Sequence, residues 1–362
     1  MKNSPLHTEH LALDAKMADF GGWLMPIEYP GAGVLAEHAA VRERVGIFDV
    51  SHLGKASVRG EGALEFLNTQ FTNDLDRISD SQAQYTLCCN EDGGVIDDLI
   101  VYRKSANDFF LIPNASNTAE VVRVLQANAP AGIVVENLHE DFGVIAVQGP
   151  RAADVLSSLG IDTNIEYMSF KEVVINGELV LLCRTGYTGE YGFEIVPTAK
   201  STRAVWEAIV EAMKPFQGLI CGLGARDTLR TEMGYPLHGH ELSLTITPVQ
   251  ASAQWAVGWK KASFLGSSAL HKERESGAVR VLRGLASSDR GIPRAGMVVK
   301  NGAGESIGEV TSGTFSPTLK HGIALALVTP DIAIGDSVII DVRGRDCLAK
   351  VVALPMVESH VR

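Results

Sequence analysis

After Glu273 the sequence becomes a series of short apolar runs separated by turns. The runs cover residues 280–286, 296–300, 306–311, 322–328, 337–342 and 347–353, with the turn Asn301–Gly304 between the second and third. Alternating runs of this length, divided by turn residues, are typical of antiparallel strands in barrels and sandwiches. We therefore predict a separate all-β domain, a barrel or jelly roll, over residues 279–362. A linker is expected around Lys272–Ala278.

The preceding 272 residues mix two patterns, which predicts α+β structure. Helical periodicity covers residues 6–19, 33–45, 62–67, 201–213 and 227–233, whereas residues 84–89, 99–103, 109–113, 133–138 and 142–147 are strand-like. Asn176-Gly177 between two apolar runs is a strong hairpin signal. Asn117 with Glu120 resembles a capping box at the start of a helix. A chain of 362 residues predicts two or three domains with sizeable cores.

The stretch from Gly93 to Tyr102 is the strongest candidate for a reactive site. Its two glycines permit a tight turn or a close approach to a ligand, and Asp97 and Asp98 then open an apolar run typical of a buried strand. Neighbouring side chains of a strand point to opposite faces, so only one of these carboxylates can face a given pocket. Tyr85 and Asn114, at the ends of flanking strands, favour a functional site. A polar turn opening a hairpin explains the same pattern without one.

A second candidate is the loop from Thr185 to Ile195. Three glycines at a spacing of three suit a backbone that wraps a flat ligand, and a plain surface loop explains them equally well. Glu194 alternates with apolar neighbours, so its carboxylate is available to accept two parallel hydrogen bonds from an amidine-like ring edge. Arg226, near the start of the helix Asp227–Met233, can reach an anion. The alternative for Arg226 is a structural salt bridge to Glu232 or Asp227.

The overall charge limits the class of partner. With 32 basic and 43 acidic residues the formal charge is −11, which argues against nucleic acid or a membrane surface as the main partner. A local cluster of arginines can still oppose this net field and bind an anionic substrate. The five cysteines contain no CxxC pair, and most lie in apolar runs, which predicts buried thiols and a reducing compartment. Residues 1–22 lack the apolar core of a signal peptide, so a cytoplasmic location is expected.

Metal and nucleotide sites are not predicted. His52 has no second ligand at metal spacing, and His238-Gly239-His240 lacks a third ligand. Gly222–Asp227 begins like a dinucleotide fingerprint, but Asp227 occupies the third glycine position and no βαβ unit frames it.

Taken together, the motifs resemble the aminomethyltransferases, the T proteins of the glycine cleavage system. The likeness runs nearly from end to end. Besides Gly93–Tyr102, Gly186–Glu194 and Gly224–Met233, it rests on Phe20–Trp23, Phe48–His52, Gln148–Pro150 and Thr311–Pro317. Several such motifs in the same order make chance similarity untenable.

The resemblance implies a fold and a reaction. The fold is a three-domain cloverleaf around a central folate site, with two interleaved α+β domains over residues 1–272 and the β domain over residues 279–362. In the reaction, lipoylated H protein delivers an aminomethyl group and tetrahydrofolate accepts the one-carbon unit. The products are 5,10-methylenetetrahydrofolate, ammonia and dihydrolipoyl H protein. Tetrahydrofolate is the co-substrate, and no metal is required.

The resemblance also assigns residues. Asp98 matches the family's catalytic carboxylate, which orients the pterin and handles a proton. Glu194 suits the adjacent N–H donors of the pterin edge, and Arg226 matches a contact to the folate tail. The remaining folate-binding candidates are Tyr85, Tyr102, Asn114, Tyr187 and Arg362, the last at a position that varies among relatives.

Two other activities use the same folate cage. A folate-dependent demethylase would act on a small methyl donor without H protein, and retention of Asp98 favours the transferase over it. A non-catalytic folate-binding factor of the iron–sulfur maintenance type would carry a Lys-Gly-Cys-Tyr signature, which this sequence lacks.

Overall fold

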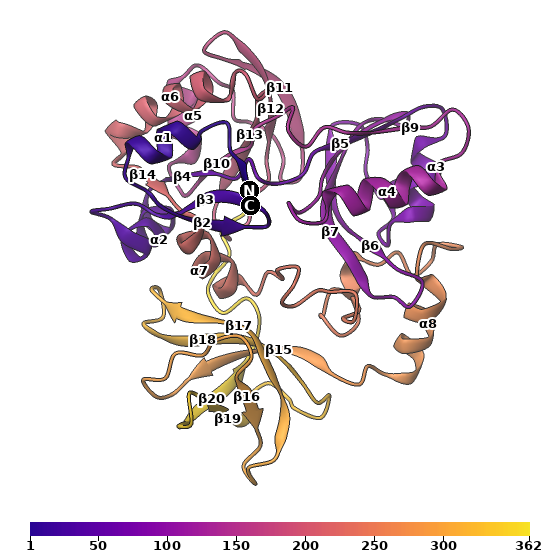
Figure 1. The fold of residues 1–362 in the computed structure, drawn as a ribbon, viewed down its shortest axis with the longest axis vertical. Helices are drawn as coiled ribbons and strands as arrows, with labels where there is room; N and C mark the ends of the chain where they lie inside the picture. The colour runs from indigo at the N-terminus through magenta and orange to yellow at the C-terminus, as the bar shows by residue number, and fades with distance from the viewer.

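A computed structural model describes all residues, 1–362, and arranges them in three groups of elements around a common centre (Figure 1). Two groups are built on open sheets and the third is a closed barrel. Mixed helices and strands followed by a barrel confirm the predicted α+β class with a C-terminal β domain. No helix combines the length and the apolar character needed to cross a membrane.

The first group is a six-stranded sheet covered by helices. Its strand order is β11-β12-β13-β10-β4-β14, where β4 is Gly46–Asp49, β10 is Ile145–Gln148, β11 is Phe170–Ile175, β12 is Glu178–Cys183, β13 is Gly192–Val196 and β14 is Leu219–Cys221. Helices α5 (Ala152–Ser158) and α6 (Thr202–Met213) pack their apolar side chains against one face. The β11–β12 hairpin turns at Asn176-Gly177, as predicted, with both residues at positive φ.

The second group is a five-stranded antiparallel sheet with order β6-β7-β8-β5-β9. Its strands are β5 (Ala56–Arg59), β6 (Gln82–Cys89), β7 (Val95–Ser105), β8 (Asp108–Ile112) and β9 (Val134–Asn137), and helices α3 (Ala63–Gln70) and α4 (Thr118–Asn128) cover one face. The opposite face meets the six-stranded sheet in a shared core that includes Phe48, Phe110 and Phe170. This shared core fixes the two sheets against each other.

The N-terminal segment differs from the sequence prediction. Helix α1 covers only His7–Ala12, followed by β2 (Lys16–Phe20), whereas the pattern predicted one helix over residues 6–19. Asp14 adopts a positive φ of 53°, which ends the helix, and β2 then pairs with β3 (Trp23–Glu28). Strand β1 (Lys2–Asn3) completes this small sheet, and α2 (Gly33–Glu43) follows it.

The third group is the predicted β domain, and it is a barrel. Six strands close in the order β15-β18-β17-β16-β19-β20; they are β15 (Val281–Ser287), β16 (Val298–Lys300), β17 (Ser306–Ser316), β18 (His321–Val328), β19 (Ser337–Asp341) and β20 (Asp346–Val352). Each coincides with one of the six predicted runs. Inward side chains such as Leu285, Val310 and Ile340 form its core.

Two helices connect the groups. Helix α7 (Leu223–Met233) begins four residues earlier than predicted and packs against β17, and α8 (Ser267–Ser276) lies beside the five-stranded sheet. Because α8 extends through Ser276, only residues 277–280 separate it from β15, so most of the expected linker is helical. Short 3₁₀ turns cover Leu75–Arg77, Lys214–Phe216 and Gln254–Ala256. All five cysteines are buried and unpaired, which confirms the predicted reduced thiols.

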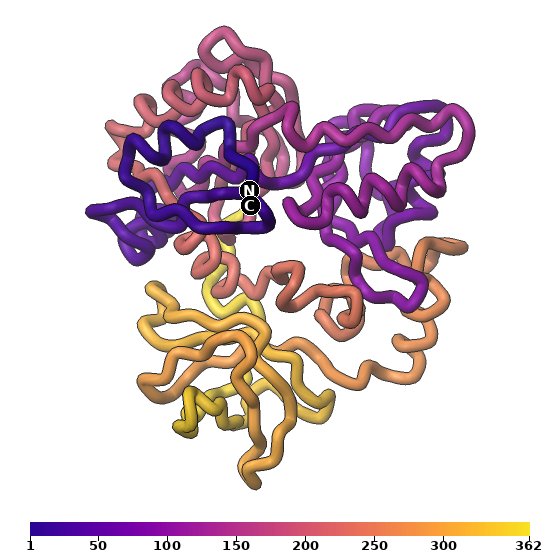
Figure 2. Tube along the Cα trace, viewed as in Figure 1, coloured from indigo at the N-terminus to yellow at the C-terminus, as the bar shows by residue number.

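The end of the chain leaves the barrel and returns past α7 to the first group (Figure 2). The Met356 N–H donates to the Glu232 carbonyl (2.8 Å), and the His360 N–H donates to the Gly189 carbonyl (2.8 Å). This return brings residue 362 to the centre of the molecule.

Candidate functional site

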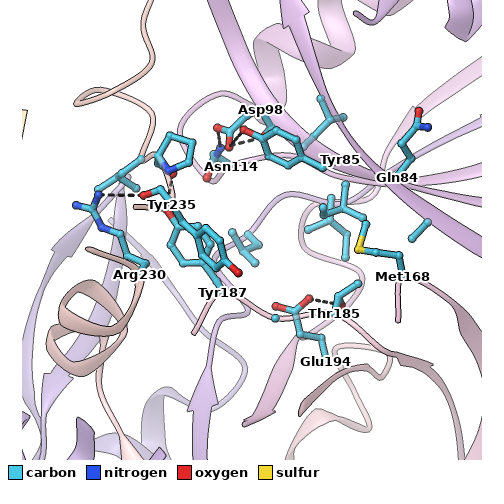
Figure 3. A pocket seen from close by; sticks show the side chains of 18 of the residues that line it. Gln84, Tyr85, Asp98, Asn114, Met168, Thr185, Tyr187, Glu194, Arg230 and Tyr235 are labelled. Carbon is cyan, nitrogen blue, oxygen red and sulfur yellow. Dashed lines mark hydrogen bonds between the residues drawn. The ribbon is translucent and has the colours of Figure 1, made fainter. Parts of the chain in front are cut away.

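A cavity of about 620 Å³ lies between the two open-sheet groups, α7 and the end of the chain. Its wall includes side chains from β6, β7, the loop after β12 and α7 (Figure 3), and Arg362 from the returning end of the chain. All eight residues singled out from the sequence line it: Asp98, Tyr85, Tyr102, Asn114, Tyr187, Glu194, Arg226 and Arg362. Positions up to 277 residues apart, from Tyr85 to Arg362, therefore converge on one cavity.

Strand β7 separates the two adjacent aspartates as its alternation predicts. Asp98, Ile100 and Tyr102 line the cavity. Val101 packs on the other side, in the core beneath α3 and α4, and Asp97 is completely buried. The two carboxylates thus have different surroundings although they are neighbours in sequence.

Asp98 is held by neutral groups only. The Tyr85 hydroxyl donates to one of its carboxylate oxygens (3.0 Å), and the Asn114 amide donates to the other (2.8 Å). No cationic side chain forms an ion pair with it. The same three residues lie together in Figure 3, with the Asp98 side chain between the two donors. The predicted grouping of Tyr85, Asp98 and Asn114 is therefore present in the structure.

Asp97 organises the turn behind this group. It accepts hydrogen bonds from the Asn114 backbone N–H (2.8 Å), the Asn114 amide (2.9 Å) and the Asn117 amide (2.7 Å). The Asn117 side chain donates to Asp97 and makes no capping hydrogen bond to the backbone of α4. The predicted capping box with Glu120 is therefore wrong. Asp97 positions Asn114, which in turn contacts Asp98.

Both carboxyl groups hold their protons more tightly than free aspartate. Burial raises the pKa of Asp97, and the neighbouring charge of Asp98 adds to the effect. Burial also raises the pKa of Asp98, although the hydrogen bond from Tyr85 opposes it. A carboxyl whose pKa is raised toward neutrality is suited to exchange protons with a bound substrate.

At another part of the wall, Glu194 on β13 presents a second carboxylate. Only 7% of Glu194 is exposed, and it accepts a hydrogen bond from the Thr185 hydroxyl (2.6 Å). The Tyr102 hydroxyl lies 3.3 Å from the same Thr185 oxygen, so Tyr102 supports this carboxylate from behind. Glu194 retains acceptor capacity toward the cavity because Thr185 is its one hydrogen-bond partner.

The glycines of both motifs serve protein packing. A Cβ atom at Gly94 would lie 1.9 Å from the Leu244 carbonyl oxygen, and one at Gly189 would lie 2.2 Å from the Met233 sulfur. Gly186 and Gly192 both pack closely against the Gln148 side chain. Gly186 also lines the cavity, and the prediction that the glycines of the Thr185–Ile195 loop wrap a flat ligand stays a prediction.

Arg226 faces the cavity without a carboxylate partner. Its guanidinium lies over the Tyr187 ring (4.6 Å to the centroid), and its buried Nη1 has no hydrogen-bond partner. Asp227 pairs instead with Arg230 (2.7 Å), and Glu232 pairs with Arg42 (2.7 Å). The alternative of a structural salt bridge at Arg226 is therefore absent. Burial lowers the pKa of Arg226, and a donor remains available to an anionic or carbonyl group.

Two stacked aromatic pairs and a second arginine complete the wall. Tyr85 stacks on Trp255 (5.2 Å between ring centroids), and Tyr187 stacks on Tyr235 (5.6 Å). The Tyr187 hydroxyl also donates to the Pro236 carbonyl. Arg362 lies 5.8 Å from the Tyr167 ring centroid and forms no ion pair. Flat faces and unpaired guanidinium groups make the cavity suitable for an aromatic anion, despite the net charge of −11.

Several lining residues were not predicted from the sequence, including Trp255, Tyr235, Met168 and Arg230. Arg230 follows Arg226 by four residues on α7, so helical spacing could have placed both on one face. Trp255 and Tyr235 lie in irregular segments, where no periodicity indicates their direction. The histidines considered for metal binding have other partners, since His238 contacts the Val95 carbonyl (3.0 Å) and His240 the Thr311 carbonyl (2.7 Å).

The chain is similar to known proteins over almost its whole length. The family described as GCVT N-terminal domain matches residues 6–261, and the glycine cleavage T-protein C-terminal barrel domain matches residues 280–358. Two proteins named aminomethyltransferase are similar over nearly their whole lengths. The one from Parafrankia sp. is 58% identical (100% of this chain, 99% of the relative), and the one from Mycobacterium avium is 54% identical (99% and 98%).

A solved structure has the same fold. The crystal structure of glycine cleavage system aminomethyltransferase T from Bartonella henselae superimposes with a TM-score of 0.93 at 34% identity and covers 99% of both chains.

Proposed function

The chain belongs to the aminomethyltransferase family of glycine cleavage T proteins, and we propose that its cavity brings two substrates together. One is the aminomethyl group on the lipoyl arm of H protein, and the other is tetrahydrofolate. The products are 5,10-methylenetetrahydrofolate, ammonia and dihydrolipoyl H protein.

The cavity wall supplies the contacts that a reduced folate requires. Glu194 accepts hydrogen bonds from the adjacent N–H donors of the pterin edge, and the aromatic pair Tyr187–Tyr235 offers a flat face to the ring system. Arg226 and Arg362, neither of which is ion-paired, face the polar and anionic parts of the same molecule. Tyr85 and Asn114 contribute to folate binding indirectly, because their hydrogen bonds hold the Asp98 carboxylate in position.

Asp98 handles protons in this scheme. The transferred carbon exchanges its bonds to sulfur and nitrogen for bonds to two folate nitrogens, so protons leave the folate as the thiol and the amine gain them. A carboxyl with a raised pKa, held within the cavity by two neutral donors, can accept one such proton and return it. It also orients the reacting groups for attack. The observation that carries the proposal is this buried carboxylate at the cavity wall, which has no ion-pair partner.

The test has two stages. Calorimetric titration with tetrahydrofolate should show binding, and aminomethylated H protein should then release ammonia only when tetrahydrofolate is present. A small N-methylated donor without H protein serves as the control for demethylase activity. Turnover of that donor in place of aminomethylated H protein would contradict the proposal, as would activity that a chelator abolishes and an added metal restores.

A further inference from the structure

The end of the chain is held across the cavity wall by specific contacts. Besides its two backbone hydrogen bonds, the segment Leu354–Arg362 is joined through His360, whose Nδ1 lies 3.1 Å from a Glu190 carboxylate oxygen. Glu190 in turn pairs with Arg42 (2.8 Å). These contacts fix the segment up to residue 360, and the last two residues need another anchor to place Arg362 at the cavity.

Arg184, the residue after β12, is that anchor. One of its terminal nitrogens, Nη2, donates to the Val361 carbonyl (2.6 Å), and Nη1 donates to the Gly192 carbonyl (3.1 Å). The side chain is only 3% exposed, and no carboxylate lies within 4.0 Å of it. Burying a guanidinium that has no carboxylate partner costs free energy unless its hydrogen bonds are made. The hydrogen bond to the Val361 carbonyl therefore stabilises both the buried Arg184 side chain and the end of the chain.

The surroundings of Arg184 connect this bond to the cavity. Its guanidinium lies over the Tyr191 ring (3.5 Å) and also faces Tyr167 (5.8 Å). Arg362 lies 5.8 Å from the same Tyr167 ring, and both Tyr167 and Arg362 line the cavity. One aromatic side chain is therefore flanked by the anchor and by the residue that the anchor places.

We propose that Arg184 is a positioning residue for folate binding. By holding the Val361 carbonyl, it keeps the Arg362 guanidinium against Tyr167, where it meets the anionic tail of the folate. Arg184 itself contacts protein groups only. The inference rests on the proposed function, and it adds that recognition of the folate tail depends on a buried residue that lies 177 positions before Val361.

The test compares two ligands that differ in the tail. In Arg184→Met, the dissociation constant for tetrahydrofolate should rise about tenfold, equivalent to ~1.4 kcal/mol, whereas that for a tetrahydropterin without the tail should change less than twofold. Arg362→Met should give the same selective loss, and the double variant should be no worse than either single variant. Arg184→Lys should lose less tetrahydrofolate affinity than Arg184→Met does. Arg151→Met, which removes a surface arginine from the Phe216 ring, is the matched control.

A second readout follows the segment directly. Val361 is held through its backbone carbonyl and its side chain is partly exposed, so it can be changed to Cys and spin-labelled selectively because all five native thiols are buried. The label should become more mobile in Arg184→Lys and in Arg184→Met, and Arg184→Lys serves alone if the Met variant does not fold. Equal weakening of both ligands, additive losses, or an unchanged label would overturn the inference. If the wild-type protein binds neither ligand, the proposed function fails instead.

Discussion

Two carboxylate sites, both withdrawn from bulk water, have opposite electrostatic surroundings. At the cavity, Asp97 and Asp98 accept hydrogen bonds from amides and a phenol, with no cation in contact, and burial raises the pKa of each. At the junction of α7 with the barrel, Glu232 contacts Arg42 (2.7 Å) and His38 (3.3 Å). The carboxylates of the first site have no ion-pair partner, whereas Glu232 is paired with Arg42.

The second site holds the molecule together. Glu232 also accepts hydrogen bonds from Ser316 (2.5 Å) and Thr318 (3.1 Å) of the barrel. Burial alone would raise the pKa of Glu232, but His38 and Arg42 outweigh it and lower the pKa to about 2. Burial by itself therefore does not identify a catalytic carboxylate. A carboxylate neutralised by cations is fixed in one state, whereas an uncompensated one can exchange a proton.

The largest effect is expected at Asp98. Asp98→Asn keeps the size of the side chain but removes its charge and its capacity to accept a proton. The turnover number should fall by roughly 10²- to 10⁴-fold, with tetrahydrofolate affinity changed far less. Ammonia release from aminomethylated H protein, together with a binding titration, measures both quantities.

Asp97→Asn is the matched control for Asp98. It should mainly lower the free energy of unfolding, because an amide placed against the Asn114 and Asn117 donors leaves buried groups unsatisfied. Equal loss of rate per folded molecule in both variants would remove the distinction between the two faces of β7. A normal rate in Asp98→Asn would exclude Asp98 from the mechanism.

Glu232→Gln should be the most destabilising single change at the junction. It removes the carboxylate charge beside His38 and one of the two carboxylates paired with Arg42, which retains Glu190 (2.8 Å), so the free energy of unfolding should fall by roughly 3 kcal/mol. Denaturant titration at pH 7 measures the loss, with the exposed Glu358→Gln as control. Because the folded pKa of about 2 lies below the unfolded value near 4.5, the contribution is present above pH 4.5 and is lost as pH falls toward 2. A constant difference between wild type and variant across that range would contradict the comparison.

A smaller effect is expected at the two arginines of α7. Arg226→Met should weaken tetrahydrofolate binding by roughly 1.5–3 kcal/mol with little change in stability, because its guanidinium has no ion-pair partner to lose. Arg230→Met should show the reverse, since Arg230 pairs with Glu241 (3.0 Å) and Asp227 (2.7 Å). Binding titrations and thermal unfolding on both variants separate the roles. Reduced stability with unchanged affinity in Arg226→Met would make Arg226 structural.

The smallest effect is in the pH dependence of the cavity site. Because the folded pKa of Asp98 is raised, the native state binds its proton more tightly than the unfolded chain does. The carboxyl's contribution to stability is then fully present below about pH 4 and declines as pH rises through the folded pKa. Asp98→Asn should flatten this part of the stability curve, as measured by denaturant titration from pH 4 to 8. The opposite slope, with stability rising over that range because of Asp98, would show a compensating charge at the site.

The sequence by itself determined the barrel strands, the β11–β12 hairpin and the opposite orientations of Asp97 and Asp98, because each depends on local alternation or on a turn dipeptide. The family motifs also marked Glu194 and Arg226 before their surroundings were known. Contacts with other segments decided three further features. These are the break between α1 and β2, the hydrogen bond from Asn117 to Asp97 and the close packing around Gly94. The same holds for Trp255 on Tyr85 and for Arg184 on Val361. Pairings across long separations depend on how the sheets and the barrel are placed, and no local pattern in a single sequence encodes that placement.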